Sequence, residues 1–198
     1  MAHRFVIIGG GPAGNTAATY AARFGAEVTM IEADLVGGSA HLRDCIPSKA
    51  MIATGSALGL INDSHRMGLT DVSATLAFDA LRARIAEIGA RLESSTTSLL
   101  ESQGVRMVRG RGRVVGERRV VADTADGPIE FEADTVLIAT GSRPRIPDWA
   151  AIDGARLLTT RDAYPPPELP EHLVVIGSGV TGVEFVHMFR SFGCRVSL

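Results

Sequence analysis

The sequence predicts an α/β fold in which a strand, a glycine-rich turn and a helix occur twice. The first copy covers residues 4–32 and the second covers residues 172–198. Each copy begins with an apolar run of strand length, passes through a Gly-x-Gly-x-x-Gly pattern and continues as a helix. A strand that is apolar throughout its middle is typical of a parallel sheet covered on both faces. We therefore expect a complete, three-layer Rossmann-like domain followed by the start of a second one.

The first copy has the features of a dinucleotide-binding turn. Gly9 permits the tight turn, Gly11 lets a pyrophosphate approach the backbone, and Gly14 lets the helix pack on the strand. The amino end of the helix directs its unpaired N–H groups at the phosphates. Glu32 closes the next strand at about the expected distance of ~20 residues, where it would accept hydrogen bonds from a ribose hydroxyl. The second copy repeats the pattern with Gly177, Gly179 and Gly182.

Helices and short strands fill the chain between the two copies. A helix is predicted to begin near Ile46-Pro47, where proline suits the first turn, and to end near Asn62-Asp63. A longer helix over residues 75–103 keeps apolar side chains on one face. Short strands at 105–108, 113–115, 119–122 and 129–131 are predicted to form a meander, with Asp126-Gly127 as a hairpin turn, and residues 135–139 form another buried strand.

Composition excludes several classes of protein. The chain has 198 residues, of which 45% are apolar and 21% charged, as in ordinary globular proteins. A formal net charge of −2 gives no positive field for nucleic acid, and the apolar runs are too short for a membrane span. Two cysteines form no disulfide framework, so we expect a reduced, cytoplasmic location. We assign no metal ligands.

Lysine usage singles out one residue. Of the 20 lysine and arginine residues, Lys49 is the only lysine. A GC-rich genome explains a general excess of arginine. Lysine carries a compact ammonium and arginine a planar fork, so a lone lysine in such a chain indicates a site that needs the compact charge.

The segment from Gly37 to Lys49 carries the most specific pattern, Gly-Gly-Ser-Ala-His-Leu-Arg-Asp-Cys-Ile-Pro-Ser-Lys. It resembles the redox segment of the flavoprotein disulfide reductases (the pyridine nucleotide-disulfide oxidoreductases), especially their dihydrolipoamide dehydrogenase-like branch. That family typically shows Gly-Gly-Thr-Cys, four residues, and then Cys-Ile-Pro-Ser-Lys. The resemblance continues through Ala139–Pro144 and from Gly177 to Glu184, so it covers the whole chain.

The resemblance implies FAD on the first turn and a nicotinamide cofactor, NADH or NADPH, on the second. It also implies that Lys49 lies beside the flavin and pairs with Glu184, where its ammonium would stabilise developing negative charge. Gly112 is expected near the adenine. The full set of expected cofactor-binding residues is Gly9, Gly11, Pro12, Ala13, Gly14, Glu32, Ala33, Gly38, Ser39, Lys49, Gly112, Ala139, Thr140, Gly141, Gly177, Gly179, Val180, Thr181, Gly182 and Glu184.

The chain departs from the family at the redox pair. Ala40 stands where the first cysteine is expected, and only Cys45 remains. A disulfide needs two sulfurs in bonding range, and Cys194 is expected to be a buried structural thiol. We therefore predict that the chain is not a disulfide reductase, and that its catalytic residues are Lys49, Glu184 and Cys45.

The residues between the two cysteine positions leave two interpretations open. His41, Arg43 and Asp44 make this stretch polar. They either line an acceptor pocket or simply begin the following helix, with Asp44 supporting its amino end as a cap and by its charge.

The expected function is that of an FAD-dependent NAD(P)H dehydrogenase. Electrons would pass from the nicotinamide through flavin directly to a quinone or another small redox acceptor, as in members of this branch that lack the cysteine pair. One alternative is a soluble pyridine nucleotide transhydrogenase, which tends to lose the second cysteine instead. Others are a peroxidase centre at a lone Cys45 thiol and a flavoprotein with a non-enzymatic role.

The expected domains are an FAD-binding domain over residues 1–148 and the amino-terminal part of an NAD(P)-binding domain over residues 149–198. Prolines at 144–147 and 165–167 mark the linker region between them. The second copy ends inside its own second strand, so we expect a fragment that lacks a carboxy-terminal dimerisation domain. The resemblance implies a homodimer for the full-length protein.

Overall fold

The computed structural model describes residues 2–198, which form two compact units. The first unit contains the chain up to Arg43 together with Gly89–Pro144, and the second contains Asp44–Ile88 with Arg145–Leu198. Each unit has a core of its own. The predicted domain limits, 1–148 and 149–198, stay a prediction.

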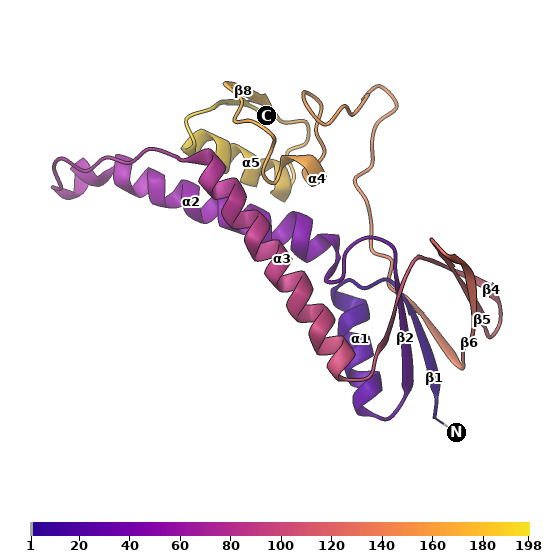
Figure 1. The fold of residues 1–198 in the computed structure, drawn as a ribbon. Coiled ribbons are helices and arrows are strands. Elements are labelled where there is room, and N and C mark those ends of the chain that lie inside the picture. Colours follow the sequence, from indigo (N-terminus) through magenta and orange to yellow (C-terminus); the bar gives the residue numbers. More distant parts are fainter. Residues whose placement is uncertain (1) are drawn as a thin grey trace. The chain divides into compact units, whose positions relative to one another are not determined.

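A four-stranded parallel sheet forms the centre of the first unit (Figure 1). Its strands lie in the order β3-β2-β1-β7, with bounds β1 (Arg4–Ile8), β2 (Glu27–Glu32), β3 (Arg106–Arg109) and β7 (Thr135–Ile138). The middle of β1 and most of β2 are buried. Burial of both faces is what their continuous apolar runs predict.

The prediction that residues 105–108 begin the meander is wrong. β3 pairs in parallel with β2, from Thr29 opposite Arg106 to Glu32 opposite Arg109. The N–H of Val105 donates to the carbonyl of Leu100 at 3.0 Å, which turns the chain back toward the sheet as the preceding helix ends. Val108 of this strand is buried in the core of the sheet, and its backbone pairing with β2 outweighs its local likeness to the strands that follow.

An antiparallel meander covers one face of the sheet. It consists of β4 (Arg111–Gly116), β5 (Arg119–Thr124) and β6 (Gly127–Glu132). Val120, Ala122 and Phe131 bury against Val6 and Ile8 of the sheet. The hairpin between β5 and β6 closes at Thr124 opposite Gly127, so its loop lies one residue earlier than predicted.

Helices cover the other face of the same sheet. They are α1 (Pro12–Arg23) and the part of α3 (Phe78–Ser102) that follows Gly89. Ile7 and Met30 of the sheet share a core with Ala18 and Leu100 of these helices. The layers of meander, sheet and helix confirm the predicted three-layer α/β fold (Figure 1).

The second unit contains the second strand–turn–helix–strand copy. β8 (His172–Val174) and β9 (Arg195–Ser197) pair in parallel and are joined by α5 (Val180–Ser191). The unit also holds α2 (Ile46–Asn62), the 3₁₀ turn η2 (Ser64–Met67), α4 (Thr160–Ala163) and the part of α3 up to Ile88. Its core includes a series of rings from Tyr164 through Phe185 and Phe189 to Phe192, with centroid distances of 4.6, 5.7 and 6.1 Å.

The helices α2 and α5 meet closely at Gly55. This residue is buried, and a Cβ built on it would lie 3.0 Å from the Cβ of Ser191. Gly59 lies one turn later on α2, and a Cβ there would meet no atom within 4 Å. The absence of a side chain at Gly55 therefore lets the two helices approach.

We expect Gly55→Val to lower the free energy of unfolding by about 1–3 kcal/mol, because its added methyl groups must push α5 away from α2. Gly59→Val is the matched control and should be neutral or slightly stabilising, because valine forms helix better than glycine does. Urea denaturation followed by circular dichroism measures both variants. Equal effects at the two positions would show that the contact at Gly55 does not limit the packing.

Candidate functional site

The first glycine-rich turn connects β1 to α1, and its backbone is in close contact with neighbouring backbone at two glycines. Gly9 has a φ of +111°, which side-chain-bearing residues rarely adopt, and a Cβ there would overlap the backbone of Ala139. A Cβ at Gly14 would overlap the carbonyl oxygen of Gly9. Glycine at both positions is therefore what lets α1 start directly at the carboxyl end of β1.

The amino end of α1 is open toward this turn. Gly11 is its N-cap residue, Pro12 and Ala13 begin the helix, and no side chain among the described residues caps it. The first N–H groups of a helix have no partner within the helix, and this end favours negative charge. Since Gly11 places no side chain over these groups, the turn fits a pyrophosphate.

The carboxylate of Glu32 is fixed beside the turn. Its Oε2 accepts a hydrogen bond from the N–H of Gly10 at 2.5 Å, and its Oε1 accepts one from the N–H of Asp34 at 2.6 Å. A Cβ on Gly10 would lie 3.2 Å from Oε2 and would crowd the Glu32 side chain. Each carboxylate oxygen can accept a further hydrogen bond, so Glu32 keeps acceptor capacity for ribose hydroxyls.

The β2 loop, residues 33–39, lies against the glycine-rich turn. The N–H of Gly37 donates to the carbonyl of Gly10 at 2.8 Å. Gly38 has a φ of +76°, and a Cβ there would lie only 2.5 Å from the Cα of Gly11. The loop begins with Ala33 and ends with Ser39, so these two predicted residues and Gly38 belong to one segment held at the turn.

Other predicted residues gather at the same edge of the sheet. The N–H of Ala139 donates to the carbonyl of Ile8 at 2.8 Å, directly before the turn. Thr140 follows beside Gly9, and Gly141 has a φ of +65°. A Cβ on Gly112, in β4, would lie 2.8 Å from the side chain of Ile8. The first unit therefore brings its predicted cofactor residues together, while their binding role stays a prediction.

The segment between the two cysteine positions forms a π-helix, η1 (Ala40–Cys45), which the sequence analysis did not foresee. A π-helix bonds residues five apart, so its single turn runs from Ala40 at one end to Cys45 at the other. Cys45 is exposed and Cys194 is buried, and both thiols are free. Burial raises the pKa of the Cys194 thiol, as expected for a structural cysteine.

The polar residues of η1 serve the local structure in part. The guanidinium of Arg43 pairs with the carboxylate of Asp34 at 2.9 Å, which ties η1 to the β2 loop. The suggestion that Asp44 caps the next helix is wrong: α2 has no side-chain cap, because η1 runs directly into it and Cys45 takes the N-cap position in a helical conformation. His41 is exposed.

The second glycine-rich turn repeats the geometry of the first within the second unit. Gly177 has a φ of +120°, and a Cβ at Gly182 would overlap the carbonyl oxygen of Gly177. Gly179 is the N-cap residue of α5, and no side chain among residues 2–198 caps that helix. Val180 and Thr181 form its first turn. The repeated unit inferred from the sequence is therefore present in backbone conformation.

Lys49 and Glu184 form an ion pair in the second unit. The Nζ of Lys49 lies 2.7 Å from the Oε1 of Glu184, and it also donates to the Oγ of Ser48 at 3.4 Å. The side chain of Lys49 is 59% exposed and that of Glu184 24% exposed. The predicted pairing of these residues is thus present, and more than half of the Lys49 side chain remains exposed.

Tyr164 is a residue of this region that the sequence analysis missed. It is only 8% exposed, and its ring stacks on Phe185, which follows Glu184. Burial, and to a smaller extent the negative charge of Glu184, raise the pKa of the phenol. No local pattern in the sequence marks this tyrosine. Gly10, whose N–H donates to Glu32, was also absent from the predicted residues, although it lies in the run Gly9-Gly10-Gly11.

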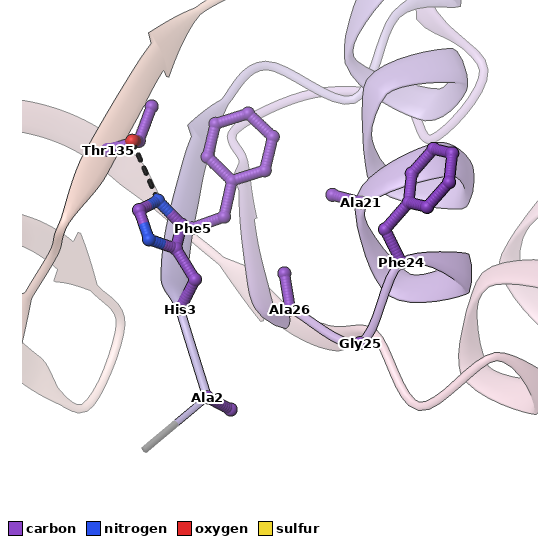
Figure 2. A pocket seen from close by; sticks show the side chains of 8 residues that line it. All are labelled: Ala2, His3, Phe5, Ala21, Phe24, Gly25, Ala26 and Thr135. Carbon is purple, nitrogen blue, oxygen red and sulfur yellow. Dashed lines mark hydrogen bonds between the residues drawn. The ribbon is translucent and has the colours of Figure 1, made fainter.

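A hollow of about 460 Å³ lies at the amino ends of the strands of the first unit's sheet, away from the glycine-rich turn (Figure 2). Its lining is mostly apolar. His3 and Thr135, which form a hydrogen bond of 2.9 Å with each other, supply polar atoms. Apolar lining comes from Phe5, Ala21, Phe24 and Ala26. It contains no predicted site residue, and β1 runs away from it toward the glycine-rich turn, so we do not assign the chemistry to this hollow.

Two other kinds of site are absent from residues 2–198. No three His, Cys, Asp or Glu side chains in this range converge as metal ligands. None of the described helices combines the length and hydropathy that crossing a membrane requires.

Two uncapped helices, each directly behind a glycine-rich turn that follows a parallel strand, are typical of dinucleotide-binding domains. The family model of the pyridine nucleotide-disulphide oxidoreductases matches residues 3–198, and the chain belongs to that family. The family uses FAD together with NAD(P)H, and the two turns fit these two groups.

Individual relatives agree with this assignment. The chain is 42% identical over its whole length to an NAD(P)H dehydrogenase (quinone) of Mycobacterium tuberculosis, and 33% identical over its whole length to a dihydrolipoyl dehydrogenase of Zymomonas mobilis. In each case it spans 43% of the relative. The crystal structure of LpdA from Mycobacterium tuberculosis matches 98% of this chain and 44% of its own, with a TM-score of 0.88 and 39% identity. The chain therefore covers less than half the length of these relatives.

The contact between Gly38 and Gly11 can be tested against a glycine of the same conformation. We expect Gly38→Ala to weaken FAD binding at least about tenfold, because the added methyl displaces the β2 loop from the turn. Gly68, with a φ of +78° and nothing within 4 Å of a built Cβ, is the control. Gly68→Ala carries the same backbone strain and should leave the FAD dissociation constant within twofold. Fluorescence titration of the apoprotein measures both, and equal losses would contradict the assigned contact.

Proposed function

We propose that the chain is the FAD-binding part, with the beginning of the nicotinamide-binding part, of an NAD(P)H dehydrogenase that reduces a quinone-type acceptor without a redox disulfide. The observation that carries the proposal is the composition of η1. Its amino end is Ala40 and its carboxyl end is Cys45, so one turn of π-helix holds a single thiol. A sulfur relay between flavin and a disulfide substrate needs two.

The glycine-rich turns hold and orient the two dinucleotides. The open amino end of α1 and Gly11 would accept the FAD pyrophosphate, and Glu32 would accept hydrogen bonds from the adenosine ribose. The open amino end of α5 would accept the pyrophosphate of NADH or NADPH. When bound, FAD supplies the two-electron chemistry that connects the nicotinamide to the acceptor.

The Lys49–Glu184 pair supplies the charge at the reacting centre. Glu184 sits in the first turns of α5, directly behind the open end of that helix, and holds the Lys49 ammonium at 2.7 Å. A preorganised positive charge stabilises negative charge that develops during hydride transfer. Cys45, exposed at the start of α2, would lie on the acceptor side of the site.

The name of the mycobacterial relative, an NAD(P)H dehydrogenase (quinone), supports a quinone as the acceptor. The domain limits at 148 and 149, a homodimer for the full-length protein and a cytoplasmic location are parts of the same proposal.

The acceptor can be tested by comparing substrates. We expect the full-length protein to oxidise NADH or NADPH with menadione as the acceptor. It should reduce lipoamide or glutathione disulfide at less than about 1% of that rate. The reason is that complete reduction of a substrate disulfide needs a second protein thiol, which resolves the mixed disulfide formed by the first. A thio-nicotinamide analogue serves as a second acceptor and tests for transhydrogenase activity. Turnover of lipoamide at a rate similar to that of menadione would refute the proposal.

The role of the ion pair gives a second test. We expect Lys49→Met to slow the reduction of bound FAD by NADH about 10- to 100-fold, because it removes the positive charge from the reacting centre. Lys49→Arg should lose less, because it keeps the charge but not the compact shape. Arg190→Met removes an exposed charge from the far end of α5 and should stay within twofold. Stopped-flow absorbance measures the rate, and equal losses at Lys49 and Arg190 would contradict the assigned role.

A further inference from the structure

The β2 loop, residues 33–39, is held by a residue far away in the sequence. Glu93 lies on α3, and its Oε1 accepts a hydrogen bond from the N–H of Val36 at 3.2 Å. Glu93 is half-buried. A backbone N–H in the middle of a loop has no partner from regular secondary structure, so this carboxylate satisfies a donor that would otherwise depend on water.

The helix that carries Glu93 is itself fixed to the first unit. Leu100 lies seven residues later on α3, and it is fully buried in the core that α1 shares with the sheet. Residues seven apart lie on the same face of a helix, so Glu93 and Leu100 are on one face of α3. Glu93 therefore offers a stable point of attachment to the loop.

Further contacts join the two ends of the loop to neighbouring elements. Asp34 pairs with Arg43 at 2.9 Å, and Gly37 donates to the carbonyl of Gly10 at 2.8 Å. These contacts join the loop to η1 and to the glycine-rich turn, while the carboxylate of Glu93 joins the N–H of Val36 to α3. The side chain of Val36 also packs against the core that contains Leu100. The loop is thus attached to three neighbouring elements of the first unit.

We propose that Glu93 is a positioning residue for FAD, which holds the β2 loop so that Glu32 and Gly38 keep their places at the first turn. Glu32 bonds the N–H of Asp34 at the start of this loop, and Gly38 touches Gly11 at its end. A loop that is ordered before the ligand arrives loses less entropy on binding. The inference rests on the proposed placement of FAD at the first turn, and it does not depend on the quinone acceptor.

Three variants of the full-length protein test this role. Glu93→Met keeps the side-chain length and the helix but removes the acceptor, and we expect it to weaken FAD binding about tenfold. Glu93→Gln keeps a carbonyl acceptor for Val36 and should bind FAD within about twofold of wild type. Glu101→Met changes an exposed glutamate on the same helix and should have no effect. FAD affinity is measured by fluorescence titration of the apoprotein.

Two further readouts separate positioning from general stability. The thermal midpoint of the Glu93→Met apoprotein should stay within a few degrees of wild type, and the amide of Val36 should exchange its hydrogen about tenfold faster in Glu93→Met but not in Glu93→Gln. Unchanged FAD affinity in Glu93→Met overturns the proposal, as does an equal loss in Glu93→Gln or a variant that fails to fold. If wild type itself bound no FAD, the placement of FAD would be wrong, which is a separate result.

Discussion

The arrangement of both glycine-rich turns depends on one steric constraint, the contact between each turn and the helix that follows it. At Gly14 and again at Gly182, the helix backbone lies so close to the preceding turn that a single methyl group would overlap a carbonyl oxygen. This contact places an uncapped helix end at the carboxyl edge of a parallel sheet. The positive end of the helix dipole and its free N–H groups then face the space where a pyrophosphate would bind.

The first unit adds polar contacts to this steric frame. Glu32 bonds the turn and the β2 loop at the same time, and the loop reaches η1 through Asp34 and Arg43. The β2 loop is therefore joined both to the first glycine-rich turn and to Arg43 of η1. In the second unit, Lys49 and Glu184 form an ion pair, and the next residue after Glu184, Phe185, stacks on Tyr164 and Phe189.

Much of this could be predicted from the sequence, because the decisive signals are local. Apolar strands, glycine spacing and the acidic residue after β2 identify both copies, and the lone lysine marks a residue that is indeed paired with Glu184. The parallel pairing of β3 could not be predicted, because a four-residue strand carries no signal for its partner. The π-helical form of η1 could not be predicted either, because the sequence pattern carries no signal for it. The same holds for the hydrogen bond that the N–H of Val36 donates to Glu93, because these residues are 57 positions apart.

The proposed function requires that the flavin be the only redox centre, because Ala40 leaves Cys45 without a second sulfur in η1. Anaerobic titration of the full-length protein with NADH, followed by absorbance, tests this most directly. Ala40→Cys is the matched variant, since it places a second thiol at the other end of the same turn. The account predicts that wild type takes up two electrons per FAD, and that the variant takes up four when its two thiols are joined. Four electrons per FAD in wild type would contradict it.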